Sequence, residues 1–170
     1  MKKINTFRIS LCALFSACAT IAFILENLFP PLILPSAHLG ISNVFILLSL
    51  VMIGYQYAFI CLIVKVIIGS LFSGNVSALM YSLPAGLISL FVETLLVYFA
   101  KNVSMVAISV CGAVVNSTLQ NTVFCLITST TEFFIYLPYL ALISCVSGAF
   151  VGLAVLLLYK NFPKKLVGKL

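Results

Sequence analysis

Seven of the charged side chains lie in the first eight or the last eleven residues, and this placement restricts the possible folds more than any other feature. These tail residues are Lys2, Lys3, Arg8, Lys160, Lys164, Lys165 and Lys169. The long region between the tails carries only Lys65, Lys101 and three Glu residues, and 64% of the whole chain is hydrophobic. A soluble domain has roughly a quarter charged residues, so a content of 7% excludes that class. The sequence therefore predicts an integral membrane protein.

Charged residues, Pro and Gly divide the chain into six apolar stretches, and a helix needs roughly 20 such residues to cross a bilayer. The predicted helices cover residues 7–29, 39–54, 57–73, 77–99, 104–128 and 136–159. The second and third are short, so we expect one of them to be tilted, partly re-entrant or broken. We predict an all-α membrane protein with six transmembrane helices in a single domain, residues 1–170.

The basic residues also predict the orientation of the chain in the membrane. Lys and Arg accumulate in cytoplasmic segments, and an even number of spans puts both basic tails on one side. Lys101, between the fourth and fifth helices, falls on that same side, whereas Glu26 and Glu132 fall on the other. We therefore expect both termini to be cytoplasmic. The net charge of +6 then reflects topology and contact with lipid headgroups, with no nucleic-acid partner.

Several kinds of chemistry are absent from the sequence. With no Asp and three separated Glu residues, the chain cannot form the carboxylate cluster that holds Mg²⁺ on a diphosphate. It has no P-loop motif, and its one histidine, His38, has no nucleophile nearby in the sequence. The six Cys residues are scattered without a C-x-x-C pair. We expect a protein that is not an enzyme and has no metal or cofactor, which leaves a transporter, a membrane subunit or a scaffold.

Two charges inside the apolar region, Lys65 and Glu93, form the first candidate site. At about 1.5 Å per residue they lie roughly 12 and 9 Å from the inner ends of consecutive antiparallel helices. Neither charge could face lipid alone without a cost of several kcal/mol, so we predict a buried ion pair. The pair serves either as a structural clamp or in transport or gating, and the sequence leaves both open.

The fifth helix provides a second candidate site. Gly112, Asn116 and Gln120 recur every four residues and share one face, with Asn121 beside them. Amides in hydrocarbon must be hydrogen-bonded, so this face is expected to point into the bundle. Contact between helices and contact with a solute remain equal alternatives.

Polar residues are also expected at the outer surface, and small residues mark a possible contact face. Glu26 and Asn27 end the first helix, and Asn75 precedes the fourth. The Pro-rich connection 30–38 is longer than a hairpin needs, and we expect it to act as a lid.

Ala13 and Ala17 lie on one face of the first helix, where small side chains allow close approach of another helix.

Several short motifs carry a resemblance to a known family. They are Leu25–Glu26, Leu28, Pro30–Pro31–Leu32, Pro35, Leu39–Gly40 and Asn43; then Lys65, Gly69–Ser70, Gly74, Tyr81–Ser82, Gly86 and Ser89; then Gly112–Ala113, Gln120, Pro138, Gly148 and Gly152. With these residues the chain resembles the small bacterial membrane family called heptaprenyl diphosphate synthase component I or Gx transporter. That family is similar to the substrate-binding (S) components of energy-coupling factor (ECF) transporters.

The resemblance implies a function and a set of site residues. It implies six helices in the bacterial plasma membrane and a cargo site near the outer face. The expected substrate-binding residues are Glu26, Asn27, Asn43, Asn75, Tyr81, Asn116, Gln120 and Asn121. It further implies that Ala13 and Ala17 dock a separate transmembrane scaffold driven by ATPase subunits.

Two interpretations follow. The first is a transporter component that binds a small solute, either vitamin-like or related to isoprenoids or quinones. The second is a non-catalytic membrane subunit that assists a soluble heptaprenyl diphosphate synthase. The sequence leaves the cargo, its direction of movement and the oligomeric state open.

Overall fold

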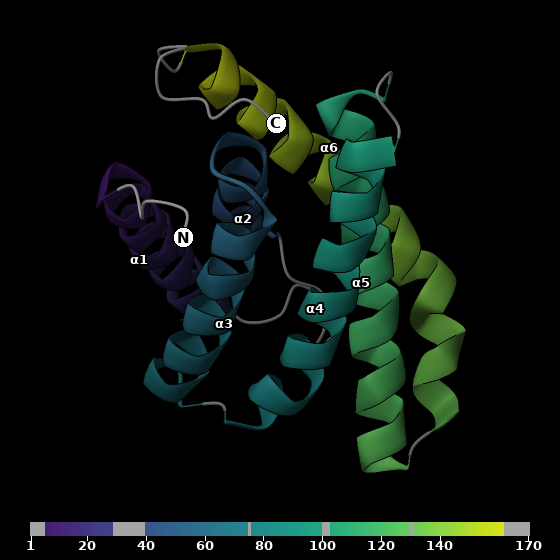
Figure 1. Cartoon of the computed structure of the whole chain (residues 1–170). Coiled ribbons are helices and arrows are strands. Elements are labelled where there is room, and N and C mark those ends of the chain that lie inside the picture. The colour runs from purple at the N-terminus through teal and green to yellow at the C-terminus, as the bar shows by residue number, and fades with distance from the viewer. Residues whose placement is uncertain (1–5, 29–39, 75, 100–102, 130, 162–170) are drawn as a thin grey trace.

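The described residues form a bundle of six α-helices (Figure 1). The structure is a computed structural model, and it describes residues 6–28, 40–74, 76–99, 103–129 and 131–161. The helices are α1 (Thr6–Leu28), α2 (Ile41–Met52), α3 (Tyr55–Phe72), α4 (Val76–Phe99), α5 (Met105–Thr128) and α6 (Leu137–Asn161). Each begins and ends within two residues of its predicted bounds. A short 3₁₀ helix, η1 (Thr131–Tyr136), precedes α6 and was not predicted.

Five of the six helices are long and apolar enough to cross a membrane, and α2 is the exception. With 12 residues, α2 is about 18 Å long, well short of the roughly 30 Å of a hydrocarbon core. The predicted all-α fold with six helices is thus confirmed in the described part of the chain, and five of these helices have spanning length. The second helix was expected to be short, and α2 is a short, continuous helix.

Helix α2 occupies the centre of the bundle and is packed by α1, α3, α4 and α6. Seven of its apolar side chains are at most 7% exposed: Val44, Ile46, Leu47, Leu48, Leu50, Val51 and Met52. A helix that is apolar on all sides is stable only where protein or lipid surrounds it, and here it forms the core. Because its neighbours supply the surrounding apolar surface, α2 needs no contact with lipid.

The connection between α2 and α3 determines where α2 ends along the bundle. Gly54 has φ 118° and ψ 168°, a conformation open mainly to glycine, and it turns the chain directly into α3. The carboxyl end of α2 therefore lies beside the start of α3. Since α2 has 12 residues and α3 has 18, the amino end of α2 stops short of the far end of α3.

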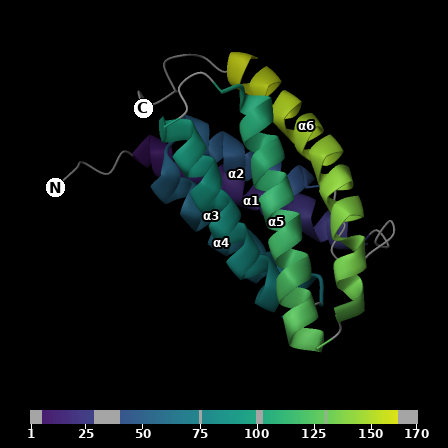
Figure 2. The same ribbon diagram turned by 90° about the vertical axis from the view of Figure 1, so that its right-hand side faces the viewer.

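Helices α4, α5 and α6 pack side by side along much of their length (Figure 2). A Cβ atom at Gly148 would lie 2.9 Å from the Val110 Cα, and one at Gly152 would lie 2.6 Å from the Val106 Cα. Both distances are shorter than real contacts allow. The small-residue pattern on α6 therefore lets its backbone approach α5, as small residues do between membrane helices.

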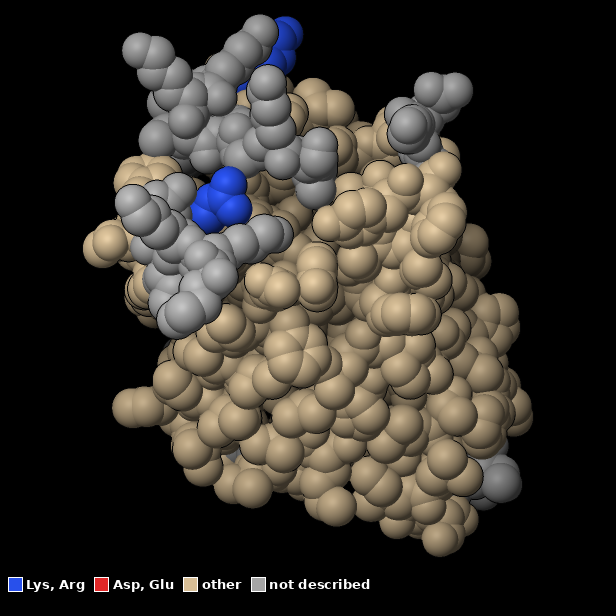
Figure 3. Space-filling view, in the orientation of Figure 1, with Lys and Arg blue, Asp and Glu red and all other residues tan. Residues whose placement is uncertain are grey.

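The outer surface is mostly uncharged. In the space-filling view the visible basic side chains gather near one end, and the other described residues visible on that face are uncharged (Figure 3). The first turn of α1 and the last turn of α6 lie toward the same end of the bundle in Figures 1 and 2. This arrangement agrees with an even number of chain crossings. Large apolar side chains such as Phe91, Phe99 and Phe150 are exposed, as expected for a surface in contact with lipid.

Candidate functional site

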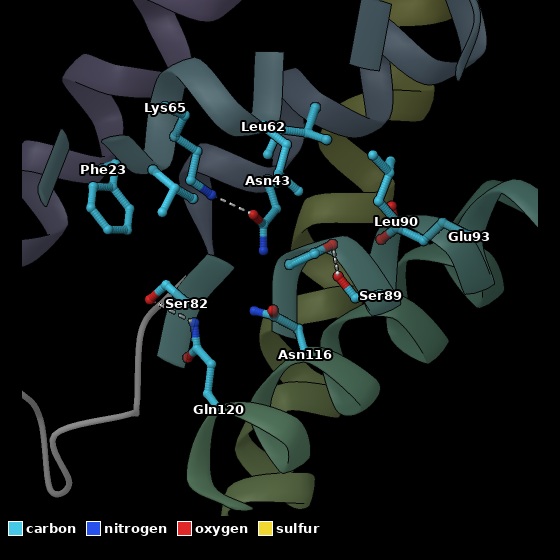
Figure 4. Close-up of a pocket in the computed structure, with 13 residues that line it drawn as sticks. Phe23, Asn43, Leu62, Lys65, Ser82, Ser89, Leu90, Glu93, Asn116 and Gln120 are labelled. Atoms are coloured by element: carbon cyan, nitrogen blue, oxygen red, sulfur yellow. Dashed lines mark hydrogen bonds between the residues drawn. The ribbon is translucent and has the colours of Figure 1, made fainter. Parts of the chain in front are cut away.

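A polar cavity lies inside the bundle, at the level where α2 begins (Figure 4). It has two adjoining lobes of about 30 and 40 Å³. Both lobes are lined by Phe23, Asn43, Lys65, Asn116 and Gln120. The first lobe adds Ser82, Ser89 and Glu93, among others, and the second adds Glu26, Gly40, Ser42, Ser117 and Ser147. The short α2 leaves room for this cavity, which brings together polar residues from all six described helices.

Lys65 lies in the wall of the cavity and is only 6% exposed. Its ammonium group donates a hydrogen bond of 2.8 Å to Asn43 Oδ1 and lies 5.3 Å from the centroid of the Phe23 ring. The amide oxygen and the ring face both stabilise a cation in a dry setting. Asn43 was expected to bind substrate, and here it is the direct partner of Lys65.

Glu93 enters the same cavity from α4 and is 9% exposed. Among the described residues it has neither a hydrogen-bond nor an ion-pair partner. The direct ion pair expected between Lys65 and Glu93 is thus not formed, because the Lys65 ammonium points to Asn43, as Figure 4 shows. The two charges line one cavity without contact.

The position of Glu93 depends on a glycine of the neighbouring helix. A Cβ atom on Gly112 would collide with the Glu93 carboxylate. The absence of a side chain at Gly112 therefore makes the space in which this carboxylate lies. Gly112 belongs to the polar face predicted for α5, and its role there is steric.

The predicted polar face of α5 does point into the bundle. Asn116 and Gln120 line both lobes, and Gln120 Nε2 donates a hydrogen bond of 3.2 Å to Ser82 Oγ on α4. Ser117, the residue after Asn116, accepts a hydrogen bond of 2.6 Å from Ser144 Oγ on α6. Gln120 and Ser117 therefore hold helices together, whereas Asn116 faces the cavity with no hydrogen-bond partner in the described part of the chain.

Glu26 caps the amino end of α2. Its Oε1 accepts hydrogen bonds from the backbone N–H of Ile41 and, at 3.4 Å, of Ser42, while its Oε2 accepts from Ser42 Oγ at 3.0 Å. The first N–H groups of a helix have no partner within the helix and carry a partial positive charge. The Glu26 carboxylate from α1 accepts hydrogen bonds from these N–H groups and also offsets their partial positive charge. The predicted site residue Glu26 thus lines the second lobe and also joins two helices.

Three predicted substrate-binding residues, Asn27, Tyr81 and Asn121, lie outside the cavity lining. The Asn27 side chain donates to the backbone carbonyl of Phe23 at 2.8 Å within its own helix. Tyr81 is buried, with its ring edge-on to Phe124 at 5.9 Å between centroids. Asn121 is 1% exposed and does not line the cavity. Asn75 falls outside the described residues, as does the predicted lid, 30–38.

A second hollow, which we call the α1–α3 groove, lies on the side of the bundle. It is almost wholly apolar, has a volume of about 580 Å³ and is lined by Ile9, Cys12, Ala13, Ser16, Ala17, Thr20, Ile21, Tyr57, Ile60, Val64 and Ile68. Ala13 and Ala17, the predicted docking residues, are exposed in it. Their small side chains are the reason that this face is hollow.

Sequence reasoning missed Phe23, Ser42 and Ser147 as residues of the cavity. Phe23 is one apolar residue among many in α1, and no pattern separates it from its neighbours. Ser42 follows the start of α2, where a hydroxyl commonly assists a helix terminus, so its position was a usable signal. Ser147 precedes Gly148 in the small-residue stretch of α6 and has no distinguishing spacing.

Comparison with known proteins gives one match. The family model described as heptaprenyl diphosphate synthase component I matches residues 14–158. No curated protein and no solved structure gives a significant match. Similarity to ECF S components is not among these findings and stays a prediction. The matched range contains the four helices from α2 to α5 and most of α1 and α6, so it covers nearly the whole bundle. This protein therefore belongs to the heptaprenyl diphosphate synthase component I family.

Proposed function

We propose that this chain is a non-catalytic membrane subunit that works with a separate, soluble component of a heptaprenyl diphosphate synthase. The observation that carries this proposal is the family match over residues 14–158. Prenyl transfer from a diphosphate needs carboxylates that hold Mg²⁺. In the described part of the chain no three His, Cys, Asp or Glu side chains gather into a possible metal site. The catalytic groups would accordingly belong to the partner.

A membrane subunit has a clear physical use in such a system. A heptaprenyl chain is a long hydrocarbon, and its transfer from water to an apolar environment is strongly favourable. A soluble synthase held at the bilayer could release this product directly into lipid. The five spanning helices support such an anchoring role, and we propose the bacterial plasma membrane as the location.

The test is co-purification with a measured activity. The tagged chain, extracted in mild detergent from its own membranes, is expected to capture a soluble protein that forms heptaprenyl diphosphate from its isoprenoid precursors. Deleting the chain is expected to move this activity from the membrane fraction to the soluble fraction. An unchanged distribution of activity, with no synthase captured, would contradict the proposal.

A second candidate function is a transporter component that binds a small solute, and the polar cavity favours it. Lys65 and Glu93 are expensive to keep inside a membrane protein, and such residues commonly line solute or ion pathways. In this proposal the α1–α3 groove, with Ala13 and Ala17, would receive a transmembrane scaffold driven by ATPase subunits.

Native mass spectrometry of the same purified material separates the two candidates. A scaffold with ATPase subunits, or a bound small molecule that is lost in Asn116→Ala, supports transport. A synthase with no small molecule supports the subunit role. Thr94→Ala is a suitable control for the ligand, since Thr94 donates to the backbone of its own helix and does not line the cavity.

A further inference from the structure

The polar cavity has more hydrogen-bonding capacity than the protein itself uses. An ammonium group has three N–H donors, and Lys65 donates one of them to Asn43. Glu93, more than nine-tenths buried, and Asn116 have no hydrogen-bond partner among the described residues. Buried polar groups in native proteins are nearly always satisfied, most strictly where the group is charged. An occupant must therefore offer acceptors to Lys65 and donors to Glu93.

The charges around the cavity limit the occupant further. Glu26 also lines the second lobe, but two N–H groups at the amino end of α2 and the Ser42 hydroxyl already donate hydrogen bonds to its oxygens. The charged groups on the wall with hydrogen-bonding capacity still unused among the described residues are then one positive group, Lys65, and one negative group, Glu93. A diphosphate, with several negative charges, would face a single ammonium and an unpaired carboxylate. The cavity is thus unsuited to a prenyl diphosphate and suited to a molecule with one charge of each sign.

The size of the cavity sets a limit on that molecule. A cavity needs about 10–15 Å³ to hold one water molecule. The two lobes of about 30 and 40 Å³ therefore have room for about five water-sized groups between them. The smallest amino acids have a similar number of non-hydrogen atoms.

From these three observations we propose that the polar cavity binds a small zwitterion that carries a carboxylate and an ammonium group. Its carboxylate accepts hydrogen bonds from Lys65 and the Asn116 amide, and its ammonium group donates to Glu93. This inference rests on the solute-binding role of the second candidate function and is independent of the assignment to a prenyl synthase.

The test uses the purified full-length chain in detergent and isothermal titration calorimetry. Glycine, β-alanine and 4-aminobutyrate form a series in which the two charges move apart. Acetate, methylammonium and inorganic diphosphate are the controls with one charge sign only. Charged hydrogen bonds contribute about 1.5–3 kcal/mol each, so at least one zwitterion should bind roughly tenfold or more tighter than acetate and methylammonium. Phosphoethanolamine, which carries a phosphate and an ammonium group, distinguishes a free amino acid from a lipid headgroup.

Variants then locate the site. Glu93→Gln and Lys65→Met should each weaken the zwitterion at least tenfold, whereas Thr94→Ala should leave its affinity unchanged. The wild-type series decides the matter even where a variant fails to fold. Binding of none of the zwitterions, equal binding of acetate, or preference for diphosphate or phosphoethanolamine would overturn the proposal. Because no partner protein is present, its failure would leave the synthase role untouched.

Discussion

The polar cavity and the α1–α3 groove are both hollows in one small membrane protein, and they differ in what they require. The groove is by far the larger, about 580 Å³ against about 30 and 40 Å³, yet its lining is nearly all apolar. Lipid tails can fill it without leaving any polar group unsatisfied. The cavity is small, but its lining contains the charged residues Lys65, Glu93 and Glu26 and an amide, Asn116, with no hydrogen-bond partner among the described residues. Inside a membrane, chemistry rather than volume therefore indicates where a specific ligand is needed.

The largest expected effect tests the charges of the cavity. Lys65→Met would leave Glu93 with no cation on the cavity wall, and a buried charge left uncompensated costs about 3–5 kcal/mol. Thermal unfolding can be followed with a thiol-reactive dye, because Cys12, Cys61 and Cys125 are buried. The double variant Lys65→Met with Glu93→Gln should be more stable than Lys65→Met alone. Strict additivity of the two changes would show that the charges do not interact.

A somewhat smaller effect is expected at the Lys65 partner. Asn43→Leu removes the acceptor of the 2.8 Å hydrogen bond and should cost about 1.5–3 kcal/mol, measured by the same unfolding assay. Asn27→Leu is the matched control, since the Asn27 side chain bonds only to the backbone of its own helix. Equal losses of unfolding free energy in the two variants would mean that the hydrogen bond between Asn43 and Lys65 adds no stability beyond that of an ordinary Asn side chain.

The space beside Glu93 gives a third test. Gly112→Ala puts a methyl group where the Glu93 carboxylate lies, and overpacking of this kind costs about 1–3 kcal/mol. It should also weaken any ligand that Glu93 binds. Cys111→Ala, at the exposed neighbouring position, should change neither the unfolding temperature nor the binding. A stable Gly112→Ala protein with unaltered binding would show that Glu93 can move freely.

The smallest expected effect on stability is in the groove. Ala13→Leu adds apolar volume to a wide, exposed hollow, so the unfolding free energy should change by less than about 0.5 kcal/mol. The same change should block a partner helix that needs close approach, which pull-down from native membranes would measure. Loss of stability would instead show that α1 and α3 close over this space.

The sequence was sufficient for the helices because apolar stretches and their breaks are local features. It also gave the inward face of α5, since a spacing of four residues fixes relative direction on a helix. It failed for the partner of Lys65. The rise per residue predicts depth along an axis, but rotation about that axis depends on packing, and here it turns Lys65 toward Asn43. The cap of Glu26 on α2 was equally hidden, because it joins residues 15 and 16 positions apart.

The short α2 has a consequence for how the protein is made. A segment of about 18 Å cannot hold itself across a bilayer, and its first N–H groups find their acceptor on α1. Helix α2 must therefore be inserted together with its neighbours, after or along with α1. Truncation after residue 52 should accordingly give a nascent chain in which only α1 is stably embedded. Biogenesis of this protein thus depends on the order in which its helices leave the insertion machinery.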